Sequence, residues 1–310
     1  MKSTQLIKLV LSLVVTLAMI APFTFLKEDI VATTVELPST TPLEPLGKEI
    51  ALKVKPLATM APRTKSKPVV KKLPENPLHQ MTLPDFAAIS DTKQKKKHFF
   101  NYMKPAVNKQ NQHLLAQRAK LLQWLDKINQ KHTLTKQEQQ ALAQLTSKYK
   151  VKKHASVLVQ LHELLLRVDI VPMPLVLVQA ANESAWGTSR FSRIGLNFFG
   201  IWCYTPGCGM VPNGRTEGDK HEVAAFKSLD DAVAHYLYNI NSNKAYRVFR
   251  TIRAELREQG HELSAEILAT GLLPYSERGA DYVIEITNML RHNRQYLTEN
   301  NDRQPIIVAE

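Results

Sequence analysis

The feature that most constrains this chain is the uneven distribution of charge and proline along its 310 residues. Residues 1–150 contain 24 Lys and Arg against 10 Asp and Glu, whereas residues 151–310 contain 17 against 18. Nine of the 17 prolines lie between Pro38 and Pro84, and ten of the 11 glycines lie at or after Gly187. Two physically different halves are therefore joined, and one uniform fold over the whole chain is excluded.

The amino-terminal segment, residues 1–26, has the pattern of a targeting sequence. Lys2 and Lys8 precede an apolar run from Leu9 to Leu26, which is typical of a secretory signal peptide or an uncleaved membrane anchor. A run of about 18 residues is near the lower limit for crossing a bilayer. The absence of a clear A-x-A cleavage site favours an anchor, so we expect membrane association on the periplasmic face of the inner membrane. Cleavage would instead release a periplasmic or exported protein.

Residues 27–90 are predicted to form a linker. Up to residue 85 this segment has no Phe, Trp or Tyr and is rich in Pro, Thr and Lys, so it cannot bury enough apolar surface to offset its ordering entropy. The composition changes at Asp91. The rest of the chain is predicted to divide into a basic helical region at 91–150, a folded domain at 151–295 and a carboxyl-terminal tail at 296–310.

Helix signals recur from residue 91 onward. Leucines at helical spacing predict a helix through 114–128, and Thr135 followed by Glu138 is a capping-box start for a second helix. Pro174 suits the first turn of a helix, and Gly187 is a plausible stop for it. The other predicted helices are, in chain order, Ser156–Val168, Leu229–Ile240 capped by Ser228, a segment from Ser264 to Gly271, and Ala280–Leu290.

Composition and motifs exclude several classes of function. Two cysteines are too few for a disulfide framework or a four-Cys zinc site, and His221 and His235 are isolated in the sequence, so no metal site is expected. Neither G-x-x-x-x-G-K-[ST] nor G-x-G-x-x-G occurs, and no cofactor is expected. The basic run Lys95–Lys97 beside Phe99 and Phe100 could indicate nucleic-acid binding. We disfavour it, because an exported protein rarely meets nucleic acid and attraction to an anionic wall polymer explains the same charge.

Glu183 is the candidate for acid–base chemistry. Helical steps back from it reach Ala180, Gln179 and Val176, so it lies on a mostly apolar stripe near the carboxyl end of the predicted helix. Partial burial and the negative end of the helix dipole both disfavour its ionised form. A carboxyl group with a raised pKa is what a general acid needs near neutral pH. By position alone, a glutamate near a helix end is usually a solvated surface residue.

The residues around Glu183 are more specific. Gln-Ala-Ala-Asn-Glu-Ser-Ala-Trp-Gly at 179–187, followed by Asn-Phe-Phe-Gly-Ile at 197–201, resembles the N-acetylglucosaminidase family of bacterial cell-wall hydrolases, glycoside hydrolase family 73. The resemblance covers about residues 155–295. It implies a lysozyme-like α+β fold, mainly α, in which a helical lobe presents Glu183 to a cleft opposite a small β-rich lobe.

The turn-rich stretch 200–226 suits that β-rich lobe, because its five glycines and two prolines favour short strands and tight turns. Glycoside hydrolysis commonly uses two carboxyl groups across the scissile bond, and Glu217 and Glu222 are the candidates for the second. Glu217 follows Thr216 in a Gly-flanked stretch, as the family's β-lobe Glu tends to do, and we prefer it. Glu222, which opens a predicted strand at 221–226, stays an alternative.

The same resemblance implies roles for further residues. Tyr275 to Tyr282 resembles the family's Tyr-x-x-Asp-x-x-Tyr segment with one extra residue between the tyrosines, which implies that Tyr282 positions the N-acetyl group or stabilises developing charge. Aromatic side chains at the cleft can also serve as platforms for sugar rings, although at least one of the three candidates, Trp186, Phe199 and Trp202, is expected to pack the core. The expected substrate-binding residues are Trp186, Asn197, Phe199, Trp202 and Tyr275.

Cys203 and Cys208 are candidates for a disulfide. They flank Tyr-Thr-Pro-Gly, a favourable β-turn string, and a turn brings two Cα atoms within disulfide range. An oxidising exported compartment favours the bond over two free thiols.

The resemblance implies a peptidoglycan hydrolase, an endo-β-N-acetylglucosaminidase that cleaves the β-1,4 bond after N-acetylglucosamine, with Glu183 as general acid. Its partners would be the glycan strands of peptidoglycan. Two alternatives stay open: a lytic transglycosylase of the same fold, and a wall-binding scaffold protein without catalysis.

Overall fold

The computed structural model describes residues 76–152, 155–212 and 221–297. The predicted targeting segment at 1–26, most of the predicted linker, Glu217 and residues 298–310 of the tail lie outside the described residues. Within these described ranges, no helix combines the length and hydrophobicity that a membrane span requires.

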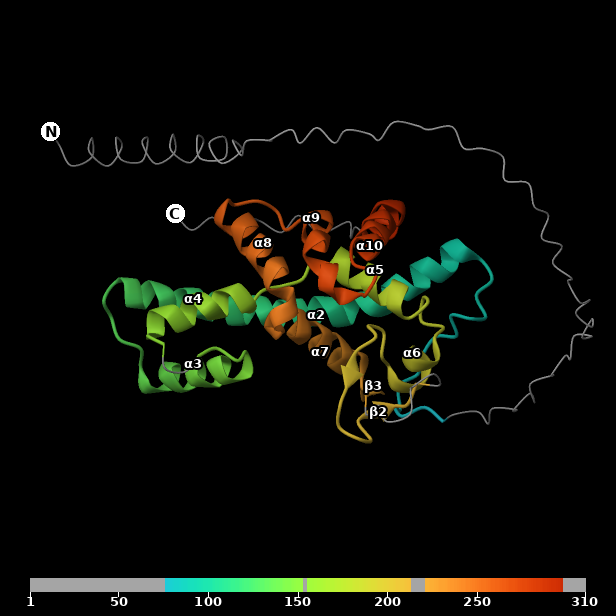
Figure 1. The fold of residues 1–310 in the computed structure, drawn as a ribbon, viewed down its shortest axis with the longest axis horizontal. Coiled ribbons are helices and arrows are strands. Elements are labelled where there is room, and N and C mark those ends of the chain that lie inside the picture. Colours follow the sequence, from blue (N-terminus) through green and yellow to red (C-terminus); the bar gives the residue numbers. More distant parts are fainter. Residues whose placement is uncertain (1–75, 153–154, 213–220, 298–310) are drawn as a thin grey trace, which may run out of the picture. The chain divides into compact units, whose positions relative to one another are not determined.

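The described chain is mainly helical with one small sheet, which confirms the expected α+β, mainly α class (Figure 1). The α-helices are α2 (Thr92–Asn129), α3 (Lys136–Lys148), α4 (Val157–Arg167), α5 (Met173–Glu183), α6 (Arg190–Gly195), α7 (Leu229–Ser242), α8 (Arg247–Glu258), α9 (Ala265–Ala269), α10 (Ala280–His292) and α11 (Arg294–Leu297), with 3₁₀-helices η1 (Lys244–Tyr246) and η2 (Thr270–Tyr275).

Side-chain caps begin several helices where the sequence predicts them. The Thr135 hydroxyl accepts from the Glu138 amide and the Glu138 carboxylate accepts from the Thr135 amide, which completes the capping box of α3. Ser156, Ser228 and Ser264 accept amide hydrogen bonds at the starts of α4, α7 and α9. Each cap satisfies an amide that has no partner within the helix, worth about 1 kcal/mol.

The long helix α2 contacts α4, α5 and α7 and runs through the centre of the fold (Figure 1). Its first turns bury Phe99 and Phe100, which pack edge-on against Trp186 in the turn after α5. The segment before α2, assigned to the linker from its composition, also joins this core, because Phe86 is 1% exposed and packs against Phe99. The basic helical region therefore supports the turn that follows Glu183.

Three short antiparallel strands form the sheet in the order β1-β3-β2, with β1 at Trp202–Cys203, β2 at Gly209–Met210 and β3 at Glu222–Ala224. The central strand β3 pairs Val223 with Trp202 on one side and with Met210 on the other. Glycine is required at 209, because a Cβ atom there would lie 2.0 Å from the Val223 carbonyl oxygen. Short strands with glycine-rich turns are what the composition of 200–226 predicts.

Candidate active site

Glu183 is the last residue of α5, a helix that is otherwise held in the core. Every residue from Leu175 to Ala181 is buried, whereas Glu183 is half-buried. The chain passes close to its carboxyl group at Gly200, where a Cβ atom would lie 3.5 Å from Glu183 Oε2. Because Gly200 is exposed and has no side chain, this residue does not cover the carboxyl group on that side.

The turn after Glu183 depends on Ser184 and Gly187 of the 179–187 string. Helix α5 ends at Glu183 rather than near Gly187, because the buried Ser184 hydroxyl donates to the Ala180 carbonyl at 2.6 Å and accepts from the Gly187 amide at 2.8 Å. Gly187 has a φ of +77°, and a Cβ atom there would lie 2.5 Å from the Phe86 ring. Serine and glycine therefore fix the direction in which the chain leaves Glu183.

A chain of hydrogen bonds inside the fold leads to Glu183. The Tyr236 hydroxyl on α7 donates to Gln179 Oε1, and Gln179 Nε2 donates to the Tyr282 hydroxyl oxygen at 2.9 Å. The Tyr282 hydroxyl in turn hydrogen-bonds to the Glu183 carboxyl group. The Tyr282 oxygen accepts from Gln179, which leaves its own proton available to Glu183. Helices α5, α7 and α10 together fix the orientation of this donor.

Burial raises the pKa of Glu183 above the usual value of a glutamate. Hydrogen bonds from Tyr282 and Asn182 and the positive charge of Arg278 act in the opposite direction without cancelling the effect of burial. Burial and the nearby Glu183 charge raise the pKa of Tyr282, so its phenol stays protonated and remains a donor. The raised pKa of Glu183 agrees with the expectation from its position on a mostly apolar helix stripe.

Tyr282→Phe tests this arrangement. The hydrogen bond from Tyr282 lowers the pKa of Glu183, so its removal is expected to raise that pKa further and to move the alkaline limb of the activity–pH profile to higher pH. Stability should fall by about 1–3 kcal/mol because the buried Gln179 amide loses its acceptor. The matched control is Tyr238→Phe, whose hydroxyl bonds only to the Lys148 carbonyl among the contacts described. An unchanged alkaline limb in Tyr282→Phe would contradict the assignment.

Two of the predicted binding residues, Phe199 and Tyr275, pack against this cluster. Phe199 is 2% exposed and stacks on Tyr236 at a centroid distance of 4.3 Å. Tyr275 stacks on Tyr282 and donates its hydroxyl hydrogen to the Phe199 carbonyl at 2.8 Å. Phe199 is therefore a packing residue, and its expected use as a sugar platform is not supported in this structure because no face of its ring is free.

Asn197 also has a structural position. It is 2% exposed, and its Nδ2 donates to the carbonyls of Ile201 and Ala224 at 2.8 Å each. Its Oδ1 accepts from the amides of Phe199 and Ile201. Both Nδ2 hydrogens and the Oδ1 atom of Asn197 are thus used to fold the 197–201 loop, which places Gly200 beside Glu183. That Asn197 also binds substrate stays a prediction.

The two tryptophans differ in what they expose. Trp202 on β1 is 47% exposed, with its ring edge-on to His221 at 4.4 Å. Trp186 is half-buried, packs on Phe99 and Phe100, and has Lys96 Nζ at 5.3 Å from its ring centre. Trp202 thus offers the largest aromatic surface for a sugar ring among the predicted platforms.

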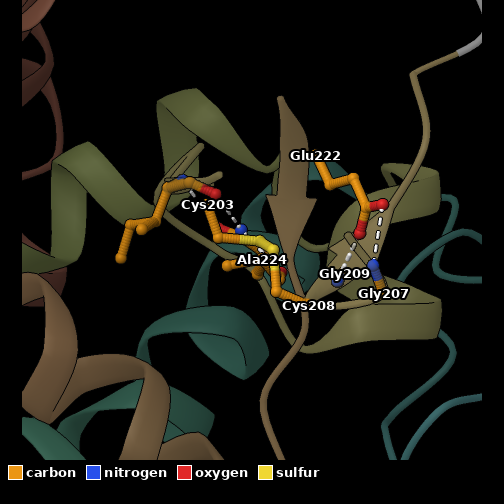
Figure 2. The surroundings of a disulfide bond; sticks show 8 residues. Cys203, Gly207, Cys208, Gly209, Glu222 and Ala224 are labelled. Atoms are coloured by element: carbon orange, nitrogen blue, oxygen red, sulfur yellow. Dashed lines mark hydrogen bonds between the residues drawn. A yellow bond between two sulfur atoms is a disulfide. The ribbon is translucent and has the colours of Figure 1, made fainter. Parts of the chain in front are cut away.

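Glu222 anchors the loop of the disulfide. Cys203 and Cys208 are bonded, with their Cα atoms 6.3 Å apart. Glu222 Oε1 accepts from the Gly207 amide at 3.0 Å and Oε2 accepts from the Gly209 amide at 2.9 Å, as Figure 2 shows. Glu222 is 7% exposed. Both of its oxygens are therefore occupied by backbone amides, an arrangement that holds a turn rather than activates water.

Cys203, Cys208 and Glu222 lie close enough together to be considered as ligands of a metal ion. Possible ligand atoms of Cys203, Cys208 and Glu222 lie within 4.8 Å of one another. Because the sulfurs are joined in a disulfide and the carboxylate accepts two amide hydrogen bonds, neither a thiolate nor a free carboxylate remains to bind a cation.

Glu222→Gln separates anchoring from catalysis. A glutamine amide would place a donor against one of the two loop amides, so stability is expected to fall by about 1–3 kcal/mol. The rate of substrate cleavage, measured well below the melting temperature, is expected to fall by less than about tenfold. Cys203→Ser with Cys208→Ser is the control for loosening the same loop, with an expected cost of about 2 kcal/mol for so short a loop. A loss of more than about a hundredfold in Glu222→Gln alone would restore a catalytic role.

Sequence reasoning missed two contributors to the Glu183 environment. Tyr236 lies among apolar residues of α7 and has the spacing of a core residue, so only its contact with Gln179 reveals its part. Arg278 lies inside the predicted 275–282 segment, and its charge acts on Glu183 while its guanidinium covers the Tyr282 ring at 5.8 Å. Glu217 lies outside the described residues.

Comparisons with known proteins identify the family of this chain. Residues 159–295 match the glucosaminidase family model, described as mannosyl-glycoprotein endo-beta-N-acetylglucosaminidase. The chain is similar to protein bax of Escherichia coli (strain K12), with 30% identity over 223 residues that cover 72% of this chain and 78% of that protein. No solved structure matches. The matched region contains Glu183 and the tyrosines around it, and the chain belongs to the glucosaminidase family, as a Bax-like member.

Proposed function

We propose that this protein is a peptidoglycan hydrolase that cleaves the β-1,4 bond after N-acetylglucosamine, with Glu183 as general acid. The observation that carries the proposal is a half-buried carboxyl group with a raised pKa, which accepts a hydrogen bond from Tyr282 and lies beside the exposed Gly200. Membership of the glucosaminidase family supports the substrate class.

Glu183 donates its proton to the glycosidic oxygen as the bond from that oxygen to C1 of N-acetylglucosamine breaks. The leaving sugar departs with a hydroxyl group and Glu183 becomes a carboxylate. The hydrogen bond from Tyr282 stabilises this developing negative charge inside a partly desolvated site. The Tyr236–Gln179 pair keeps the Tyr282 proton directed at Glu183 throughout.

A water molecule then forms the new bond to C1 and gives a proton to a second base. We propose Glu217 for this role. Glu222 is disfavoured because both of its oxygens hold the amides of Gly207 and Gly209, and Glu217 keeps the position of the family's β-lobe carboxylate in the sequence. The acetamido group of the substrate is the alternative nucleophile in families that lack a second carboxylate.

We propose an exported protein that the segment 1–26 either anchors to the inner membrane or releases into the periplasm. The basic charge of residues 1–150 supports retention near anionic wall polymers. Fractionation tests the anchor: extraction from membranes only by detergent supports it, and release by osmotic shock supports a cleaved signal.

Product analysis tests the reaction. The full-length protein is incubated with purified sacculi, and the soluble fragments are reduced with borohydride and identified by mass spectrometry. New reducing ends on N-acetylglucosamine are expected. Fragments ending in 1,6-anhydro sugars would instead show a lytic transglycosylase, and binding to sacculi without soluble fragments would show a scaffold protein.

A further inference from the structure

A groove of about 720 Å³ lies between the carboxyl end of α5, one face of α10 and the first turns of α2. It begins beside the proposed catalytic carboxyl group, because its wall includes Asn182, whose Nδ2 lies 3.5 Å from Glu183 Oε1. Arg278, whose charge acts on Glu183, lines the same wall. The groove and the Glu183 carboxyl group therefore share Asn182 and Arg278 as neighbours.

Charges of both signs line the groove. Lys96 on α2 holds its ammonium group 5.3 Å from the centre of the Trp186 ring and forms no ion pair with any described residue. Asp281, in the first turn of α10, is exposed, and its carboxylate has no ion pair within the described ranges. Arg278 differs, since it pairs with Glu285. One cation and one anion are thus available to a ligand.

A third feature lies in the floor of the groove. Asn293 is 2% exposed; its Nδ2 donates to the Met289 carbonyl at 2.8 Å, while its Oδ1 has no hydrogen-bond partner among the described residues. A buried acceptor without a partner costs free energy. Because this oxygen is buried from solvent, it is not open to a ligand in the groove.

We propose that the groove binds the short peptide carried by the muramic acid residue next to the scissile bond, an inference that rests on the proposed function. The two sugar rings at a scissile bond are largely uncharged, and they do not require a free ammonium and a free carboxylate. The stem peptide bears both carboxylates and the amino group of a diamino acid, together with backbone amides. A volume of about 720 Å³ is in the range of sites for small ligands.

In this arrangement a stem carboxylate pairs with Lys96, the diamino acid's ammonium pairs with Asp281, and amides of the peptide meet Asn182. Trp186 supplies the apolar floor beneath Lys96. The groove would therefore make the enzyme prefer glycan that still carries its peptides.

The test compares two forms of one substrate. Uncrosslinked glycan strands are used either with their peptides or after an amidase has removed them, and kcat/KM is measured for the full-length protein on each. The wild type is expected to favour the peptide-bearing strands by about tenfold, the size of one charge-assisted contact. Lys96→Glu is expected to lose this preference and to cleave the stripped strands at the wild-type rate.

Lys97→Glu is the matched control, because it changes the net charge equally on the same helix turn and its exposed side chain does not line the groove. It should behave as the wild type on both substrates. Equal kcat/KM of the wild type on the two substrates would overturn the inference. An equal loss of kcat/KM in Lys96→Glu on the peptide-bearing and the stripped strands would also overturn it.

A binding measurement separates the failure of this inference from that of the proposed function. The tripeptide L-alanyl-γ-D-glutamyl-diaminopimelate is titrated into the full-length protein by calorimetry. Binding that weakens about tenfold or more in Lys96→Glu but not in Lys97→Glu supports the groove even if neither strand is cleaved. Absence of binding to the wild type, or equal binding to all three proteins, rejects it even if both strands are cleaved.

Discussion

Glu183→Gln is expected to lower kcat on peptidoglycan by about 10²- to 10⁴-fold, the usual contribution of a general acid. Glutamine keeps the shape of the side chain and a carbonyl oxygen that can accept the Tyr282 hydrogen bond, but it has no proton to give to the leaving oxygen. The rate is measured as release of reducing ends from sacculi. A variant that retains wild-type kcat would remove Glu183 from the mechanism.

Stability provides an independent readout of the same residue. Because burial raises the pKa of Glu183 above the ordinary value of 4.5, the folded state holds this proton more tightly than the unfolded state does. The wild type therefore loses stability as pH rises from below 4.5 through the raised pKa. Glu183→Gln cannot lose a proton, so it is expected to melt at a higher temperature than the wild type at pH 7 and at a similar temperature at pH 4.

Melting curves of the wild type and Glu183→Gln at pH 4 and pH 7 check whether the pKa of Glu183 is raised or lowered by folding. Glu285→Gln is the control, since Glu285 lies on α10 and pairs with Arg278 at an exposed position. Glu285→Gln should show no rise in melting temperature over the wild type at pH 7. A lower melting temperature for Glu183→Gln at pH 7 would mean that the carboxylate is stabilised, rather than penalised, by its surroundings.

Asp169→Asn is expected to cost about 3–5 kcal/mol of stability, the penalty for leaving buried charge without its partner. Asp169 is 1% exposed, and its carboxylate accepts from Arg257 at 3.0 and 3.1 Å. Arg118 lies 3.5 Å from the same carboxylate. The neutral asparagine would leave these guanidinium groups, and the nearby charge of buried Arg253, without a counter-ion.

The network joins segments far apart in the chain. The Arg253 guanidinium donates to the carbonyls of Leu166, Asp169 and Ile170, and so ties α8 to the connection between α4 and α5. Although burial alone would raise the pKa of Asp169, the charges of Arg253, Arg118 and Arg257 outweigh it and lower that pKa. Its stabilisation is therefore fully present above the ordinary value of 3.8 and is lost as pH falls through the lowered value.

Urea unfolding at pH 7 measures this effect. Asp230→Asn is the control, because its pair with Lys109 is solvent-exposed and should be worth less than about 1 kcal/mol. The difference between wild type and Asp169→Asn is expected to persist at pH 5 and to shrink below pH 3.8. A difference as small as that of Asp230→Asn would show that the buried network contributes no more than a surface pair.

Local chemistry made much of the fold predictable. The caps at Thr135, Ser156, Ser228 and Ser264 act on amides within three residues, so the starts of α3, α4, α7 and α9 follow from the sequence. The class of the fold and the family could also be predicted, because apolar spacing and a nine-residue string are properties of contiguous chain.

The roles of individual side chains were less accessible. Asn197 and Phe199 belong to the family string, but whether they face a sugar or the core depends on Ala224 and Tyr236, which lie in distant segments. The same holds for Glu222, whose oxygens are occupied by the turn between β1 and β2. Pattern alone could not distinguish such structural roles from binding or catalysis.

The sequence by itself determined that Glu183 lies near the carboxyl end of a helix whose stripe is apolar, because helix periodicity and the flanking prolines and glycines are local. Only the tertiary structure decided which groups meet its carboxyl group. Tyr236, Tyr282 and Gly200 come from three separate elements, and burial and the direction of a hydrogen bond are properties of packed neighbours. Proton affinity depends on those neighbours, so the acidity of Glu183 is set by the fold.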